Sequence, residues 1–240
     1  MAEYLLSLKD RRQVAEGTTA FWFDTTGTDF SFAAGQNADY VLDNPPYTDA
    51  EGNKRTFSFA SSPQHRGWFM IATRMRPTAF KNSLKEVPLG TKVKVVGPLG
   101  NMVLHDDATK PAVMIAGGIG ITPFRSMIED ATMRKLPHQV LLLYSNRTAA
   151  VTAFRDDLEQ WAKQNMNLKA VFTITDTDDP AWPYERGMVD EVFIKKQVPD
   201  LTKSVFYIAG PDAMTLAMRK MLLELGVSKD NIKLEAFSGY

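Results

Sequence analysis

The stretch AGGIGITPF, Ala116–Phe124, places three glycines within four positions and follows them at once with Thr122 and Pro123. Glycine loses more conformational freedom on folding than any other residue, so such a cluster needs a structural reason. The short apolar run before it, PAVMIA at residues 111–116, is typical of a buried strand. The residues after it have apolar side chains at helical spacing: Phe124, Met127, Ile128 and Ala131.

The stretch therefore predicts a strand, a glycine turn and a helix. We expect Thr122 as the N-cap and Pro123 at the first helical position. Such a turn directs free backbone amides and the positive end of a helix dipole at one point, which suits a pyrophosphate. The dinucleotide fingerprint G-x-G-x-x-G is matched in part, since Pro123 stands in the place of its third glycine. A tight turn without a ligand is the alternative interpretation.

The composition indicates an ordinary globular protein of one to two domains. The chain has 240 residues, 44% hydrophobic and 23% charged. Its 28 basic and 28 acidic residues cancel, so nothing favours nucleic acid as a partner. The first residues lack the apolar core of a signal peptide, and no apolar run approaches the roughly 20 residues of a membrane span. We expect a cytoplasmic location without membrane insertion.

The chain contains no cysteine, which excludes disulfides, thiol nucleophiles, cysteine-bound zinc and cysteine-held iron–sulfur clusters. Its three histidines, His65, His105 and His138, lie far apart without metal-ligand spacing. We therefore expect no metal site.

The two parts of the chain differ in the order and spacing of their expected strands and helices. Up to about residue 100, short aromatic or β-branched runs are separated by Gly, Pro, Asn or Asp, which predicts an antiparallel β-barrel interrupted by one helix at 78–86. After about residue 108, strands alternate with helices, which predicts an α/β domain with a parallel sheet. The predicted fold therefore has two domains, at residues 1–106 and 107–240.

A second stretch, RTFSFASSP at Arg55–Pro63, combines an arginine with an aromatic on one face of a strand. A guanidinium can fork onto a phosphate while an aromatic covers a flat ring. On its own, an exposed Arg beside a buried Phe is commonplace.

Taken in order, the motifs resemble the ferredoxin–NADP reductase superfamily of flavoproteins over nearly the whole chain. The matching segments are RTFS (Arg55–Ser58), AGGIGITP (Ala116–Pro123), YIAGPDAM (Tyr207–Met214) and LEAF (Leu234–Phe237). The resemblance implies a flavin-binding barrel, identified with residues 1–106, and an NAD(P)-binding domain, identified with residues 107–240. It implies bound FAD, with FMN the less favoured flavin, and NADPH or NADH as co-substrate.

The resemblance also implies roles for individual residues. Arg55 and Thr56 would lie at the flavin phosphate, Phe57 would pack on the flavin ring, and Ser58 would lie near its N5 atom. The phosphate or adenylate side would be lined by Ala72, Thr73, Arg74, Phe80 and Lys81. Lys81 stands where many members have a small hydroxyl residue, and Ala209 stands where some have a cysteine.

For the dinucleotide, the resemblance implies a cradle made of Gly117, Gly118, Gly120, Thr122 and Pro123. Gly210, Pro211 and Met214 would border the nicotinamide channel. Ser145 and Arg147 follow the second strand of the α/β part, where the ribose 2′ position is read, and the arginine there slightly favours NADPH. The catalytic set would be Ser58, Glu235 and Phe237, with either Phe237 or Tyr240 shielding the flavin.

The function that the resemblance implies is an NAD(P)H reductase that passes electrons through FAD to an external acceptor. Ferredoxin, flavodoxin, a cytochrome or an oxygenase would fit, since no cysteine in this chain can hold a one-electron centre. Two alternatives stay open. The first is a free-flavin or ferric reductase that uses flavin as substrate, and the second is a non-catalytic module that binds flavin and nicotinamide.

Overall fold

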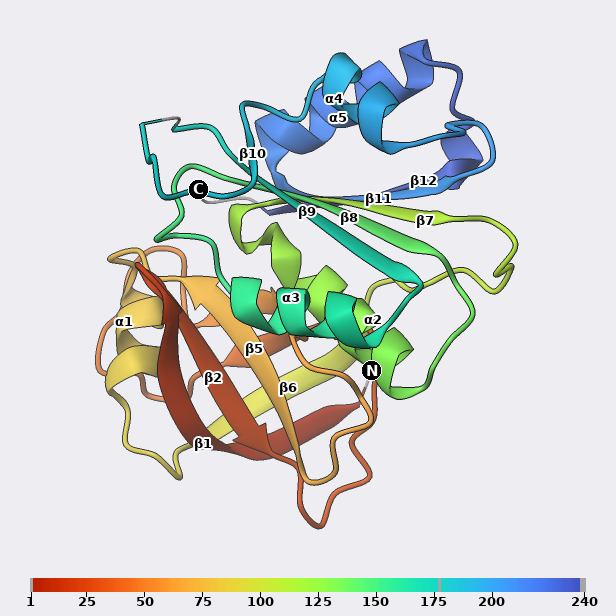
Figure 1. Ribbon diagram of the computed structural model, residues 1–240. Coiled ribbons are helices and arrows are strands. Elements are labelled where there is room, and N and C mark those ends of the chain that lie inside the picture. The colour runs from red at the N-terminus through yellow and green to blue at the C-terminus, as the bar shows by residue number, and fades with distance from the viewer. Residues whose placement is uncertain (1, 177, 238–240) are drawn as a thin grey trace.

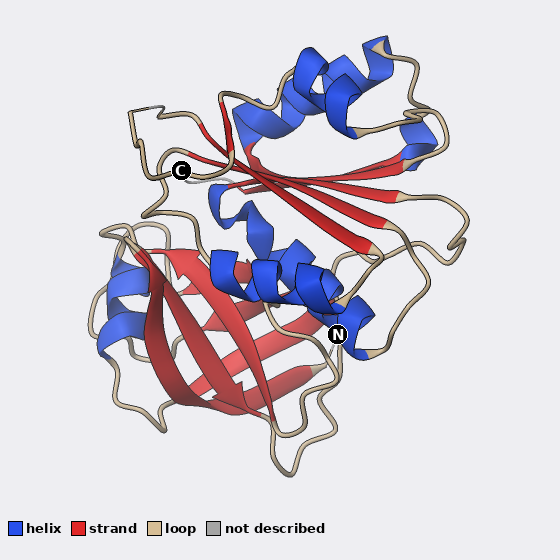
Figure 2. Ribbon diagram, in the orientation of Figure 1, coloured by secondary structure: helices blue, strands red, loops and turns tan. Residues whose placement is uncertain are grey.

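The computed structural model describes residues 2–176 and 178–237 and contains two six-stranded sheets (Figures 1 and 2). The first is antiparallel, with strand order β4-β3-β6-β1-β2-β5. Its strands are β1 (Glu3–Ala15), β2 (Thr18–Asp24), β3 (Asn37–Val41), β4 (Lys54–Ser58), β5 (Trp68–Arg74) and β6 (Lys92–Leu99). A bridge between Phe59 and Ile71 joins its two edges, so the sheet closes into a barrel.

The barrel is filled by aromatic rings that alternate along its strands. Phe21 and Phe23 of β2 and Phe69 of β5 are fully buried, and the Phe23 and Phe69 rings stack with centroids 5.4 Å apart. Helix α1 (Ala79–Glu86) closes the barrel on one side, with Phe80 and Leu84 buried. Its N-cap is Thr78, whose side chain accepts a hydrogen bond from the backbone N–H of Lys81.

The second sheet is parallel in every pair, with strand order β10-β9-β8-β7-β11-β12. Its strands are β7 (Ala112–Gly117), β8 (Val140–Asn146), β9 (Leu168–Ile174), β10 (Glu185–Arg186), β11 (Val205–Pro211) and β12 (Ile232–Phe237). Helices α2 (Ile121–Met133) and α3 (Arg155–Gln164) lie between this sheet and the barrel (Figure 1). Helices α4 (Glu191–Gln197) and α5 (Asp212–Glu224) cover the opposite face (Figure 2).

The two-domain fold class predicted from the sequence is confirmed by this architecture. The segment 100–111 joins the two sheets, and the boundary placed between residues 106 and 107 stays a prediction. One continuous apolar core spans the contact between the sheets, because Ala60 and Met70 of the barrel pack with Phe124 and Met127 of α2. This core holds the barrel against α2.

The predicted start of α2 was wrong. Gly118–Gly120 form a 3-10 turn that runs directly into the α-helix, so the helix begins at Ile121 and its N-cap is Gly120. The Thr122 hydroxyl donates back to the carbonyl of Ile119 at 3.0 Å instead of capping the helix. Pro123 consequently lies two residues inside the helix, where its missing N–H removes no intrahelical bond.

Candidate functional site

A groove of about 320 Å³ separates the barrel from the carboxyl edge of the second sheet. Its barrel side is formed by the ends of β4 and β5 and the start of α1, and its other side by Ile119, Thr122 and Phe237. The barrel residues that line it are Glu51, Arg55, Thr56, Phe57, Ser58, Ala72, Thr73, Arg74, Arg76, Thr78 and Lys81. Residues from three separate sequence motifs thus meet in one groove.

The polar end of the groove is rich in cations. Burial, together with the charges of Arg76 and Arg55, lowers the pKa of Lys81 to about 8. The Lys81 ammonium donates to the carbonyl of Arg74 at 2.8 Å. Crowded, partly buried cations beside a helix N-terminus form an environment that suits phosphate oxygens.

Arg55 is held by the loop that precedes β4. Its guanidinium pairs with Glu51 at 2.6 Å and donates to the backbone carbonyls of Glu51 and Gly52 at 3.0 and 3.2 Å. It also lies 5.7 Å from the centre of the Phe80 ring. Phe80 itself is 1% exposed and supports Arg55 and Phe57 from inside the barrel, so it does not line the groove.

Ser58, which lines the groove, contacts Glu235 of β12. The Ser58 hydroxyl donates to Oε1 of Glu235 at 3.3 Å, and the side-chain amide of Asn37 donates to the same oxygen at 3.0 Å. The second oxygen, Oε2, is buried without a hydrogen-bond partner among the described residues. Burial raises the pKa of Glu235, and the bonds from Asn37 and Ser58 oppose this only in part. The carboxyl group is therefore harder to ionise than an exposed glutamate.

The three glycines of the turn have different structural reasons. A Cβ on Gly120 would lie 2.2 Å from the Ala209 carbonyl oxygen, and one on Gly117 would lie 2.4 Å from the Met214 sulfur. Gly118 has φ of +54°, in the left-handed region that favours glycine. Close packing of the turn against the backbone of β11 thus requires Gly120 irrespective of any ligand, whereas a side chain at Gly117 would have to displace the side chain of Met214.

The remaining predicted residues lie along the carboxyl edge of the second sheet. Gly210 and Pro211 end β11 and adjoin Gly117, while Met214 lies in the first turn of α5. Ser145 lies near the end of β8, and Arg147 follows that strand with an exposed side chain. Because the strands are parallel, all these ends share one edge. Tyr240 lies outside the described residues.

Asn37 and Arg76 belong to the site although sequence reasoning missed them. Asn37 opens β3 and lies 198 residues from its partner Glu235, a separation without any local signal. Among the described residues, no group of three or more His, Asp or Glu side chains could hold a metal ion. In the same part of the chain, no helix is long and apolar enough to cross a membrane.

Known proteins are similar to this chain in sequence and in fold. Residues 114–220 match the oxidoreductase NAD-binding domain family. The flavohemoprotein of Rhizobium meliloti is 30% identical over 194 residues, which cover 76% of this chain and 47% of the relative. Ferredoxin–NADP reductase B of Sorangium cellulosum is 27% identical over 223 residues, which cover 88% and 87% of the two chains.

Among solved structures, a ferredoxin NADP⁺ reductase from Neisseria gonorrhoeae with bound FAD and NADP superimposes with a TM-score of 0.81. It is 16% identical, and the match covers 98% of each chain. These matches identify a flavin- and NAD(P)-binding reductase domain similar to those of the ferredoxin–NADP reductase superfamily, and the solved structure shares its two-sheet fold. The chain spans about half the length of several of the curated relatives that it matches.

Proposed function

We propose that the chain is an FAD-dependent NAD(P)H reductase that delivers electrons to a separate acceptor protein. The observation that carries the proposal is the contact at 3.3 Å between Ser58, which lines the groove, and Glu235 of β12. This contact brings β4 of the barrel, which ends in RTFS, next to β12, the last strand of the parallel sheet. A flavin ring held by the barrel would meet a nicotinamide dinucleotide held by the parallel sheet at this point.

The groove residues fit a flavin phosphate in charge and position. Arg55, Arg74 and Lys81 supply positive charge, and α1 adds the backbone amides of its first turn. Thr56, Ala72 and Thr73 line the space between these cations and Ser58. When bound, the flavin would supply the two-electron redox chemistry that no side chain of this chain offers.

For the nicotinamide dinucleotide, we assign binding to the carboxyl edge of the parallel sheet. The turn at Gly117, Gly118 and Gly120 would hold the pyrophosphate, with Thr122 and Pro123 at the base of the cradle. Gly210, Pro211 and Met214 would border the nicotinamide, and Ser145 and Arg147 the adenosine ribose.

Glu235 is assigned the handling of a proton at the reaction centre. Its Oε1 accepts bonds from Ser58 and Asn37, so its Oε2 is the atom at which a proton would be held or released. A raised pKa brings a carboxyl group closer to the operating pH, which favours acid–base exchange. Phe237, at the end of the same strand, would cover the ring from the dinucleotide side.

The acceptor is assigned by chemical class. The chain has no cysteine to hold an iron–sulfur cluster, so a one-electron carrier must be supplied by another protein or domain. One relative is named as a flavohemoprotein and another as a ferredoxin–NADP reductase. A haem or iron–sulfur protein would therefore suit this chain.

The experiment that tests the function is a spectrum of the purified protein, followed by anaerobic titration with NADH and with NADPH. We expect bound FAD, identified by mass after release, and its bleaching by at least one nicotinamide. A colourless protein that reduces added flavin would instead support a free-flavin reductase. Bound flavin that neither nicotinamide reduces would support a non-catalytic module.

A further inference from the structure

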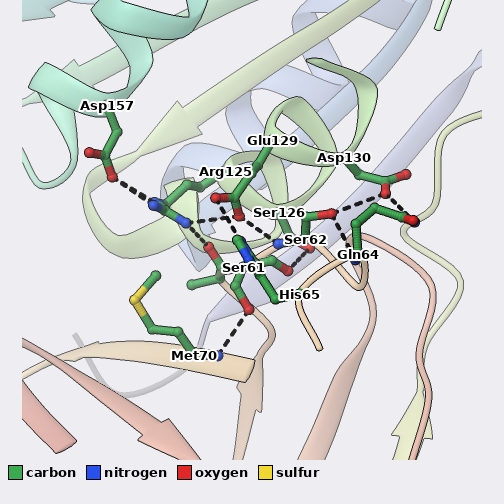
Figure 3. A network of polar contacts seen from close by, with 11 residues as sticks. Ser61, Ser62, Gln64, His65, Met70, Arg125, Ser126, Glu129, Asp130 and Asp157 are labelled. Atoms are coloured by element: carbon green, nitrogen blue, oxygen red, sulfur yellow. Dashed lines mark hydrogen bonds and ion pairs between the residues drawn. The ribbon is translucent and has the colours of Figure 1, made fainter. Parts of the chain in front are cut away.

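A largely buried set of polar side chains joins α2 to the barrel (Figure 3). We call it the α2–barrel network. Its members from the segment after β4 are Ser61, Ser62, Gln64 and His65, and those from α2 are Arg125, Ser126, Glu129 and Asp130. No motif of the proposed cofactor sites includes them.

The network holds main-chain atoms of the barrel directly. Arg125 donates to the carbonyl of Ala60, and the Ser126 hydroxyl donates to the carbonyl of Ser61 at 2.7 Å. Glu129 accepts from the backbone N–H of Ser62 at 2.6 Å. One face of α2 thus binds three successive residues, which fixes their position along the helix.

Arg125 connects this contact to a third element. Its guanidinium donates to Asp157 of α3 at 2.6 Å and lies 3.4 Å from Glu129. The rings of Phe154 and Trp161 lie 4.7 and 4.8 Å from its central carbon. The residue is 8% exposed, so its planar group is held on every side by named partners.

The network lies between the two halves of the proposed site. Ala60 is two residues from Ser58, whose hydroxyl contacts Glu235. On the other side, Arg125 lies about one helical turn from Thr122, which lines the groove. A helix is stiff over one turn, so the bonds at Ala60 and Ser62 set how far the glycine turn lies from Ser58.

Stability alone does not explain a buried charged network here. Ala60, Met70, Phe124 and Met127 already form an apolar contact between the barrel and α2. Replacing buried ion pairs by well-packed apolar side chains is often neutral or stabilising. Directional hydrogen bonds also fix the orientation of the elements that they join, and the rate of hydride transfer depends steeply on the orientation of the reacting groups.

We propose that Arg125 is a positioning residue for hydride transfer, which aligns Ser58 and the flavin ring with the nicotinamide without touching either ligand. This proposal rests on the reductase function proposed above. Glu129 and Ser126 act with Arg125 by holding Ser62 and Ser61.

The test compares Arg125→Met and Arg125→Lys with Arg134→Met as the matched control. Arg134 lies just after the same helix and pairs with Asp130, but its side chain is 51% exposed. Folding, the flavin dissociation constant and the limiting rate of flavin reduction at saturating nicotinamide are measured for each. We expect Arg125→Met to lower the limiting rate about tenfold or more, with flavin affinity changed less than about twofold. Arg125→Lys should recover part of the rate, and Arg134→Met should match the wild type.

A double-mutant cycle separates positioning from general destabilisation. If Arg125 acts through Ser58, the effect of Arg125→Lys on the limiting rate should shrink in a Ser58→Ala background. If Arg125→Lys lowers the limiting rate as much in the Ser58→Ala background as in the wild type, the proposal is overturned. It is also overturned if folded, flavin-loaded Arg125→Met has the wild-type limiting rate. Should Arg125→Met fail to fold, Ser126→Ala, which removes a single bond to Ser61, carries the same test. If neither nicotinamide reduces the flavin of the wild type, both the reductase function and the role of Arg125 are overturned. If the wild type is active and the Arg125 variants reduce their flavin at the wild-type rate, only the role of Arg125 is overturned.

Discussion

Glu129 and Glu235 both lie between the barrel and the parallel sheet, and their carboxylates have opposite surroundings. Glu129 accepts from Ser62 and His65 and pairs with Arg125, so both of its oxygens have partners. Burial acts to raise its pKa, but the His65 bond and the Arg125 charge outweigh burial and lower it. Glu235 has two donors on one oxygen and none on the other among the described residues, and its pKa is raised.

The cations of the network and those of the groove also differ in their surroundings. In the α2–barrel network, Arg125 is paired with Asp157 and Glu129. In the groove, Arg55, Arg76 and Lys81 lie close enough for the arginines to lower the pKa of Lys81. Arg125 is thus paired with two carboxylates, whereas the groove gathers several cations at one place, of which Arg55 pairs with Glu51.

Breaking the α2–barrel network should have the largest effect, which is on the free energy of unfolding. Glu129→Ala leaves the buried N–H of Ser62 without its partner and removes one of the two carboxylates that pair with Arg125, so we expect a loss of about 3–5 kcal/mol in the free energy of unfolding. Denaturant titration measures it. The matched control is Glu191→Ala, which removes an exposed pair with Lys195 and should cost less than about 1 kcal/mol. Equal losses of unfolding free energy in the two variants would show that Glu129 contributes no more to stability than a residue of an exposed ion pair.

Removing charge from the groove should affect the ligand more than the fold. Arg55→Ala is expected to weaken flavin binding by about 1.5–3 kcal/mol, the range for hydrogen bonds to charged groups. Flavin dissociation constants measure it by fluorescence. Lys54→Ala removes a neighbouring cation that pairs with Asp39 outside the groove and should leave flavin affinity unchanged. Full flavin retention by Arg55→Ala would remove this residue from the binding site.

The lowered pKa of Lys81 predicts a pH dependence of flavin affinity. With a pKa of about 8, Lys81 loses its proton as the pH rises through that value, and its attraction for phosphate is lost with it. Affinity should therefore fall above pH 8, by about tenfold per pH unit at most for one proton. Lys81→Gln should abolish this dependence, whereas Lys85→Gln at the end of the same helix should retain it. A Lys81→Gln variant with the wild-type pH profile would contradict the assignment.

The smallest expected effect concerns the exposed edge of the site. Arg147 is solvent-exposed, so its pairing with a ribose 2′-phosphate should contribute about 1 kcal/mol. Arg147→Ala should lower the catalytic efficiency with NADPH roughly fivefold and leave that with NADH unchanged. Lys163→Ala, on the exposed face of α3, is the control. An unchanged ratio of the two efficiencies would show that Arg147 does not read the ribose.

Local patterns predicted most of the fold. Short aromatic or β-branched runs between turn residues marked β2 and β5, and the helix predicted at 78–86 is α1. Strand β1 was missed because its second half, Lys9–Gln13, is charged or polar and partly exposed, which hides the period of two. Helix α4 was missed because it has seven residues, of which Phe193 and Ile194 alone are buried.

The candidate site was predicted in part. Residues whose partners lie far away in the sequence could not be predicted. The resemblance brought together RTFS, the glycine turn and LEAF, and the structure places residues from all three at one groove. Asn37 and Arg125 have no such motif, because their partners lie 198 and 65 residues away. Only the assembled fold shows which buried carboxylate is fully paired and which has an oxygen without a partner.

The central claim is that the contact of Ser58 with Glu235 marks the reaction centre, and flavin reduction tests it most directly. Anaerobic stopped-flow measures the limiting rate at saturating nicotinamide in the wild type, Glu235→Gln and Ser58→Ala, each with its flavin dissociation constant. We predict that both variants retain flavin and that each lowers the limiting rate about tenfold or more, as for loss of a proton-transfer or orienting group. Limiting rates equal to the wild type, in variants fully loaded with flavin, would contradict it.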